Sequence, residues 1–275
     1  MAAARPSRCR VGFTAAVLSA GLASGIAVAA ETVRIAAPSV GGVAEIAVTL
    51  EGTAGAPVVV LVSGLGEGRA DWAAVVPRLA PCSRVLRYDR PGIGDSRPVP
   101  VAPVMAEAAV GDLAALLSAL RLAPPFVLVG HSLGALYVQA FARAHPTETA
   151  GAVLVDGASP LEPPGVFVST IPPVPGTAEA AEEAGVAPSQ AAMLAGPPFP
   201  DVPLVVIAAT DHADTPERET LWRDVQRRTA ALSPQGRLVI AEGSGHAVQD
   251  DQPETVVDAV LAVLESAGAD TAACR

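Results

Sequence analysis

The chain has 275 residues, of which 51% are hydrophobic and 3% are aromatic, so it can bury a sizeable core made mainly of Ala, Val and Leu. Its formal net charge is −10, and all 18 of its basic residues are arginines, with no basic cluster. An acidic chain of this kind is a poor candidate for binding nucleic acid or an anionic membrane, so we expect neither partner.

The first 30 residues have the pattern of a secretory signal peptide. Three arginines precede an apolar stretch at 11–28, and the small residues Ala29 and Ala30 offer a cleavage site. An uncleaved membrane anchor is the alternative. We therefore expect a cleaved leader at 1–30, a domain at 31–275, and a secreted or periplasmic bacterial protein without stable membrane insertion after cleavage.

Cleavage would also change the number of cysteines. It would remove Cys9 and leave two, Cys82 and Cys274. An even number in an oxidising compartment is typical of a disulfide, and two unpaired thiols are the alternative.

The first half of the domain alternates short apolar runs with helical segments. The run at 58–62 is apolar at every position, which is typical of a buried parallel strand. Val110, Leu113 and Leu117 recur at helical spacing. In chain order we expect strands at 32–36, 45–50, 58–62 and 84–88, and helices at 71–80 and 105–120.

The most informative motif follows the next expected strand, at 126–129. Residues 130–134 read G-H-S-L-G, a G-x-S-x-G sequence followed by a helical segment to about residue 145. A serine hydroxyl is a weak nucleophile near neutral pH, and a sharp strand-to-helix turn holds it where a base and N–H donors can reach it. The motif predicts Ser132 as a nucleophile, and an ordinary Gly-rich turn is the alternative.

The alternation continues after this motif but is interrupted at 157–201. That segment is rich in proline, and only 178–184 has a helical pattern. Strands alternating with helices predict an α/β domain with a mostly parallel sheet covered on both faces. In this half we expect strands at 152–156, 204–208 and 237–241, and helices at 217–232 and 253–266.

Four segments make the chain similar to the α/β-hydrolase superfamily. They read LVSGLG at 61–66, YDRPGIGDS at 88–96, GHSLG at 130–134 and GSGH at 243–246. The resemblance covers about 33–267 and implies an eight-stranded, mostly parallel sheet with helices on both faces and a short Pro-rich lid at about 157–201. It also implies a serine hydrolase that cleaves ester, amide or lactone bonds of a small hydrophobic substrate.

The resemblance assigns the base and leaves the acid open. His246 follows the strand at 237–241 in a Gly-rich loop, and histidine suits proton transfer near neutral pH. Asp211 lies closest to the usual position of the acid, and Asp214 is three residues later. Asp156 ends an earlier strand, at a position that some members use. All three keep the chain order Ser…Asp…His.

Two backbone N–H groups are expected to form an oxyanion hole. Leu133 follows the nucleophile, and Leu65 lies in the loop after the strand at 58–62. Asp89 and Arg90 are expected to organise neighbouring loops. The sequence has neither the ligand spacing of a metal site nor a phosphate-binding P-loop, so we expect no cofactor.

The family topology also bears on the cysteines. It places the helix before Cys82 and the helix before Cys274 on the same face of the sheet. We therefore expect a Cys82–Cys274 disulfide at the end of the sheet away from Ser132.

Two other functions stay open from the sequence. One is a non-catalytic binding protein on the same fold, and the other is an aminopeptidase or acyltransferase with the same triad. Acidic residues that could bind an amino terminus are Glu162, Glu179, Glu182 and Glu183. Apolar residues that could form a wall of the site are Leu161, Val166, Phe167, Val168, Ile171, Met193, Leu194 and Phe199.

Overall fold

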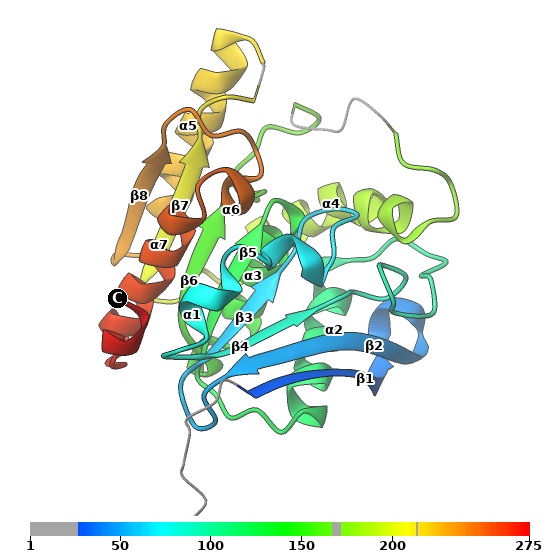
Figure 1. Ribbon diagram of the computed structural model, residues 1–275. Helices are drawn as coiled ribbons and strands as arrows, with labels where there is room; N and C mark the ends of the chain where they lie inside the picture. The colour runs from blue at the N-terminus through cyan, green and yellow to red at the C-terminus, as the bar shows by residue number, and fades with distance from the viewer. Residues whose placement is uncertain (1–26, 167–171, 213) are drawn as a thin grey trace, which may run out of the picture.

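The computed structural model describes residues 27–166, 172–212 and 214–275 (Figure 1). Most of the expected signal peptide lies outside the described residues, as do Phe167, Val168 and Ile171 of the expected apolar wall. The first strand, β1 (Ala27–Ala37), includes the last residues of the segment expected to be cleaved. No helix in the described ranges combines the length and the apolar character needed to cross a membrane.

The strands of the described residues form one eight-stranded sheet in the order β1-β2-β4-β3-β5-β6-β7-β8. The pairs β1–β2 and β2–β4 are antiparallel, and all other neighbours are parallel, which confirms the expected sheet. The bounds are β1 (Ala27–Ala37), β2 (Gly42–Gly52), β3 (Val58–Val62), β4 (Arg84–Tyr88), β5 (Phe126–His131), β6 (Thr149–Val155), β7 (Leu204–Ala209) and β8 (Gly236–Ala241).

Helices cover both faces of the sheet, as predicted (Figure 1). One face packs against α2, α3 and α5, and the other against α1, α6 and α7, while α4 contacts α2 and α3. The bounds are α1 (Val76–Leu79), α2 (Ala106–Ala119), α3 (Leu133–Ala144), α4 (Ala178–Ala195), α5 (Pro216–Ala230), α6 (Val248–Asp251) and α7 (Pro253–Ser266).

The two helical layers explain why β3 is apolar at every position. Successive side chains of a strand point to opposite faces of the sheet. Val58, Val60 and Val62 pack in the core beneath α2 and α3. Val59 and Leu61 pack in the core beneath α1 and α7. Both faces of the strand are therefore removed from water, which stabilises the centre of the sheet.

The prediction of one helix at 71–80 is wrong. The segment forms a 3-10 turn at Arg69–Trp72 and then the short α1. Pro77 lies in the first turn of α1, where its missing N–H does no harm, but the same residue prevents a longer helix from running through this position.

The helix expected at 178–184 is longer than predicted and extends over the whole of α4. Gly185 and Pro188 suggest a helix end, but α4 continues through both. A Cβ on Gly185 would lie 1.9 Å from the carbonyl oxygen of Val104, so this glycine lets α4 pack directly against the backbone that leads into α2.

The expected disulfide is present. It joins Cys82 to Cys274, whose Cα atoms are 5.5 Å apart. Cys82 precedes β4, so the bond lies near the amino ends of the parallel strands, away from the turn that follows β5. It ties the C-terminal residues after α7 to the segment after α1.

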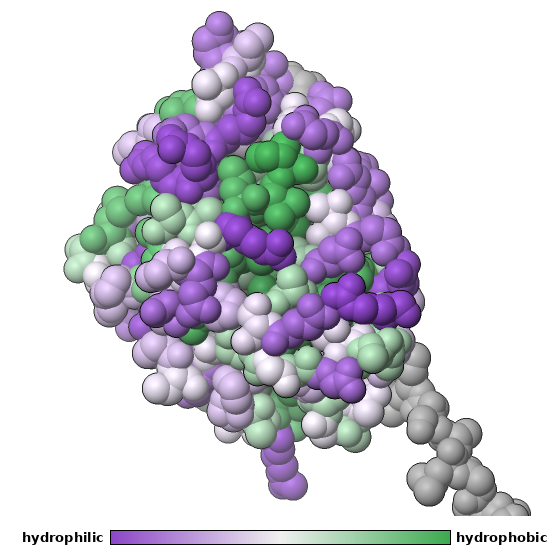
Figure 2. Space-filling view, turned by 90° about the vertical axis from the view of Figure 1, so that its left-hand side faces the viewer, coloured by the Kyte–Doolittle hydropathy of each residue, from purple (hydrophilic) through white to green (hydrophobic). Residues whose placement is uncertain are grey.

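The last strand, β8, forms one edge of the sheet. Figure 2 shows hydrophobic side chains gathered over this edge, with the hydrophilic surface of α5 next to them. Ile240 is 37% exposed, and Arg237 lies on the same short strand. A charged residue on an edge strand hinders pairing with another sheet edge.

Candidate active site

Ser132 lies in a strained turn between β5 and α3. Its φ is +48°, in the left-handed region that residues other than glycine rarely adopt. The N–H of Ser132 donates to the carbonyl oxygen of Val155 at 3.1 Å, and its own carbonyl accepts from the N–H of Ala158 at 2.9 Å. These bonds hold the serine at the N-terminus of α3.

The flanking glycines allow the strand and the helix to approach closely. A Cβ on Gly130 would lie 2.5 Å from the carbonyl oxygen of Gly134. A Cβ on Gly134 would lie 2.1 Å from the carbonyl oxygen of Val62 on the neighbouring strand. Any side chain at either position would push the turn away from the sheet, so the tight packing requires both glycines.

Ser132 and His246 line the same pocket, which has a volume of about 660 Å³. Leu65 and Leu133, whose N–H groups the sequence predicts to form an oxyanion hole, line it too. Neither N–H donates to an acceptor among the residues that the structure describes. Both groups are therefore available to a ligand oxygen next to Ser132.

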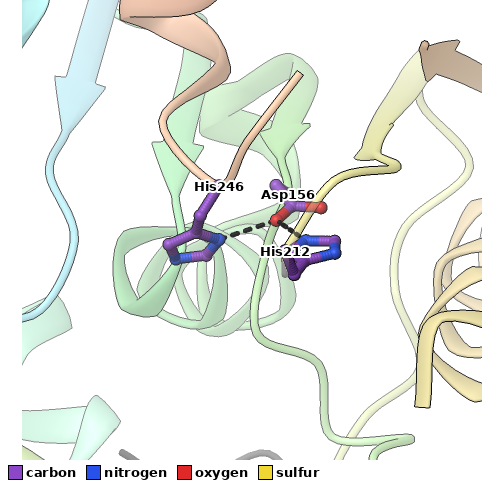
Figure 3. A group of neighbouring side chains, drawn as sticks. All are labelled: Asp156, His212 and His246. Carbon is purple, nitrogen blue, oxygen red and sulfur yellow. Dashed lines mark hydrogen bonds and ion pairs between the residues drawn. The ribbon is translucent and has the colours of Figure 1, made fainter. Parts of the chain in front are cut away.

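Asp156 is the carboxylate that meets His246 (Figure 3). It follows β6, and its Oδ2 lies 2.6 Å from Nδ1 of His246. The Asp156 side chain is fully buried, whereas 47% of the His246 side chain is exposed. The imidazole thus has one nitrogen against a buried anion while its ring reaches the wall of the pocket.

The surroundings of Asp156 keep it ionised. Its Oδ1 accepts from the N–H of Ala209 at 3.0 Å and from Nε1 of Trp222 at 2.7 Å. Burial alone would raise the pKa of Asp156, but hydrogen bonds from His212 and His246 hold that pKa well below its usual range. An ionised carboxylate only accepts, so Nδ1 of His246 carries a proton, and Nε2 of the neutral ring is free to take one.

The other two candidate acids have partners other than His246. The N–H of Asp211 donates to the carbonyl oxygen of Ser244 at 2.9 Å, which anchors one loop to the next. Asp214 forms an ion pair with Arg218. Among the described residues, neither carboxylate bonds to His246. The structure therefore brings Ser132, His246 and Asp156 to the same edge of the sheet, while Asp214 lines the pocket as the partner of Arg218.

A second hydrogen-bond chain supports the backbone of His246. Nε2 of the fully buried His131 lies 3.0 Å from the carbonyl oxygen of His246, and its Nδ1 lies 2.7 Å from Oε2 of Glu67. The same Glu67 oxygen accepts from the N–H of Gly64 at 2.7 Å. Sequence reasoning did not assign this role to His131, although the position next to the nucleophile was a usable clue.

A histidine of the polar loop after β7, His212, also lies in the site, and only 18% of its side chain is exposed. Its Nε2 lies 2.7 Å from Oδ2 of Asp156, the same oxygen that meets His246 (Figure 3). The end of β7 lies beside the end of β6, so the loop after β7 brings His212 into the site. The only sequence signal for His212 was its position next to Asp211, one of the candidate acids.

Asp156, His212 and His246 also form a donor set of the kind that binds metal ions, with their ligand atoms within 4.8 Å of one another. Their spacing favours hydrogen bonds over metal coordination. Both nitrogens lie 2.6–2.7 Å from one carboxylate oxygen. Ligands of a tetrahedral zinc ion with bonds near 2.0 Å lie roughly 3.3 Å apart. The arrangement is therefore that of two histidines sharing one acid.

Arg90 has the structural role that the sequence predicts. Its guanidinium donates to the carbonyl oxygens of Ser63 and Gly64, each at 2.6 Å, and so holds the loop that carries Leu65. It also forms a buried ion pair with Glu182 of α4. Glu182, one of the acids expected near the site, is therefore committed to this pair.

None of the expected apolar residues that the structure describes lines the pocket. The polar residues that the segment between β6 and β7 contributes to the lining are Glu162, Glu179, Glu183 and Gln190. Met193 and Phe199 pack into the core, and Leu194 is 62% exposed. The acidic residues on the pocket wall outnumber its basic ones. The charged or titratable residues lining the pocket are Glu67, Glu162, Glu179, Glu183, Asp214, Glu219, His212, Arg218 and His246.

Comparison with known proteins agrees with the observed fold. Residues 57–185 match the sequence family described as the alpha/beta hydrolase fold. A protein of Klebsiella pneumoniae (strain 342) with the provisional name carbamate hydrolase RutD is 39% identical over 112 residues, which are 40% of this chain and 41% of that relative. The match thus spans about two fifths of the relative's length.

Solved structures match over most of the chain. A thermophilic esterase from Thermogutta terrifontis is 25% identical with a TM-score of 0.67, over 86% of this chain and 99% of the esterase. The carboxylesterase CesB of Bacillus subtilis is 17% identical and has the same fold, with a TM-score of 0.61 over 87% of this chain and 92% of that enzyme. The sheet order, the turn at Ser132 and these matches together show that the chain belongs to the α/β-hydrolase superfamily.

Proposed function

We propose that this protein is a serine hydrolase of carboxylic esters, with Ser132 as nucleophile, His246 as base and Asp156 as acid. One observation carries the proposal. The buried Asp156 carboxylate holds Nδ1 of His246 at 2.6 Å, on the wall of the pocket that also contains Ser132. The strained backbone at Ser132 adds support, because such strain is commonly stored at reacting groups.

The first half of the reaction forms an acyl-enzyme. Nε2 of His246 takes the hydroxyl proton as Oγ of Ser132 bonds to the substrate carbonyl carbon. The carbonyl oxygen becomes an anion, which the N–H groups of Leu65 and Leu133 stabilise. The tetrahedral intermediate then expels the alcohol, which receives the proton from His246.

The second half releases the acid. A water molecule loses a proton to His246 and attacks the acyl carbon, and the returning proton regenerates the hydroxyl of Ser132. Asp156 stays ionised throughout. Its charge stabilises the imidazolium that forms on His246 in both halves, and its hydrogen bond keeps the ring in the required tautomer.

Covalent labelling tests the nucleophile directly. Purified protein is incubated with a fluorophosphonate probe, and the modified residue is located by peptide mass spectrometry. We expect stoichiometric labelling of Ser132, because an activated serine attacks the phosphorus centre and the oxyanion hole receives the phosphoryl oxygen. The Ser132→Ala variant serves as the control and is expected not to be labelled.

A protein that folds and is not labelled at Ser132 would be a non-catalytic member of the fold. If Ser132 is labelled, a panel of p-nitrophenyl esters of increasing acyl length, together with an aryl carbamate, defines the substrate. The carbamate is included because of the name of the Klebsiella relative. Turnover that depends on Ser132 with any ester of the panel supports the proposal.

A second candidate is an enzyme for substrates that carry an amine, such as an aminopeptidase. The observation that favours it is the position of Glu179 and Glu183 on one face of α4, both lining the pocket. Neither carboxylate has a hydrogen-bond or ion-pair partner among the described residues. Arg218, the basic side chain of the lining, is paired with Asp214. An unpaired anion beside the nucleophile favours a cationic substrate group.

Esters that differ only in charge test this candidate. We expect a choline ester to exceed its uncharged 3,3-dimethylbutyl isostere in kcat/KM by about tenfold, which corresponds to about 1.4 kcal/mol. The preference should weaken with added salt and disappear in Glu179→Gln/Glu183→Gln. Glu217→Gln, outside the pocket lining, is the matched control. Equal kcat/KM values for the two esters would contradict the candidate.

A further inference from the structure

Asp156 accepts hydrogen bonds from two histidines, although the proposed reaction requires only one. Its Oδ2 lies 2.6 Å from Nδ1 of His246 and 2.7 Å from Nε2 of His212 (Figure 3). His212 comes from the loop after β7, on the other side of the carboxylate from His246. The mechanism gives this second histidine no proton to move, so its presence needs another explanation.

The second nitrogen of His212 also faces an acid. Nδ1 of His212 lies 2.9 and 3.0 Å from the two carboxylate oxygens of Glu219 on α5, and the backbone N–H of His212 donates to Glu219 at 2.9 Å. A neutral imidazole carries one N–H, so it can donate to only one of two carboxylates. With Asp156 on one side and Glu219 on the other, the doubly protonated cation satisfies both.

The charges around His212 agree with a cation at this position. Its hydrogen bond to Asp156 is the largest influence, followed by burial, which acts in the opposite direction, and then by Glu219; together they raise the pKa of His212 to about 9. Asp214 lies on the same loop and is paired with Arg218 of α5. The His246 ring is 6.2 Å away, across the Asp156 carboxylate.

We propose that His212 is a positioning residue of the hydrolytic site, acting as a cationic clamp between Asp156 and Glu219. It holds the Asp156 carboxylate in the orientation in which Oδ2 receives Nδ1–H of His246, and it fastens that carboxylate to α5. The role rests on the proposed function, because it acts on the reaction only through Asp156 and His246.

The clamp has a defined pH range. The pKa of His212 is raised from its ordinary value of 6.5 to about 9, so the stabilisation by the protonated form is complete below pH 6.5 and is lost as the pH rises through about 9. Above that pH one of the two carboxylates faces a bare nitrogen and loses its donor. Asp156 is then held less firmly, and kcat should fall with a midpoint near pH 9.

Two variants separate this role from a merely structural one. Glu219→Gln removes one anion but keeps a hydrogen-bonding side chain, so the alkaline midpoint of kcat should move to lower pH by at least about half a unit. His212→Gln keeps a neutral donor that does not titrate, so kcat should fall about tenfold at pH 7 and the alkaline limb should disappear. KM should change less than kcat. If both variants lose kcat equally at every pH and the alkaline midpoint is unchanged, the proposal is overturned.

Histidine NMR supplies a readout that needs no turnover. The protein contains four histidines, and His212→Gln assigns one resonance in protein labelled with ¹⁵N-histidine. We expect that resonance to titrate near pH 9 in the wild type and lower in Glu219→Gln. If the protein hydrolyses esters through Ser132 but His212 titrates near pH 6.5, the cationic clamp is overturned and the proposed function is not. Titration near pH 9 without Ser132-dependent hydrolysis would overturn the positioning role together with the proposed function.

Discussion

Replacing Asp156 by asparagine is expected to lower kcat by about 10³- to 10⁴-fold. The substitution keeps the shape of the side chain but removes the charge that stabilises the His246 imidazolium. An amide nitrogen at the Oδ2 position would also donate to the ring and favour the wrong tautomer. The measurement is kcat for the best ester of the panel, in protein whose melting temperature shows that it is folded.

Asp211→Asn and Asp214→Asn are the matched controls for this prediction. Both residues were candidate acids, both change by the same single atom and charge, and neither bonds to His246 among the described residues. We expect their kcat values to stay within about threefold of the wild type, as for side chains that the reaction does not use. A large loss in Asp211→Asn with little loss in Asp156→Asn would reverse the assignment of the acid.

Replacing Arg90 by methionine is expected to lower the free energy of unfolding by about 3–5 kcal/mol. Arg90 and Glu182 are 5% and 2% exposed, so the variant leaves a buried carboxylate without its partner. Burial would lower the pKa of Arg90, but Glu182 raises it, so the two charges depend on each other. The carbonyls of Ser63 and Gly64 also lose a donor. Urea unfolding, followed by circular dichroism, measures the effect.

The double variant Arg90→Met/Glu182→Leu shows how much of that loss comes from the stranded charge. We expect it to recover part of the stability, because a hydrophobic pair avoids the cost of the unpaired anion, while the loop carbonyls stay without their donor. Arg78→Met is the exposed comparison. Its ion pair with Glu254 has side chains 50% and 57% exposed and should contribute less than about 1 kcal/mol. Equal losses in Arg78→Met and Arg90→Met would contradict the prediction.

Features with a local physical cause could be predicted from the chain. The strands at 58–62 and 84–88 and the helix at 253–266 have the expected bounds. Their signals, a run of apolar residues or apolar residues at helical spacing, lie within the segment itself. The turn at Ser132 is also local, because glycines on both sides of a serine between a strand and a helix describe one close-packed bend.

Features that depend on distant backbone could not be predicted. Gly185 and Pro188 have the composition of a helix end, yet α4 continues because the glycine lets it contact the backbone at Val104. The short α1 has the opposite explanation, since a proline within the segment prevents a longer helix. The bounds of α4 thus depend on its contact with distant backbone, whereas those of α1 depend on a proline in its own segment.

The amino-acid order alone predicted the type of domain, the turn at Ser132, the candidate base His246 and the disulfide partners, because each has a short motif or follows from the order of strands and helices. It left the choice among three aspartates open, since all follow strands and keep the same chain order. The folded sheet separated them: the end of β6 lies beside the end of β5, and there the buried Asp156 meets His246. The same packing brought His212, from the neighbouring strand end, onto the other side of that carboxylate.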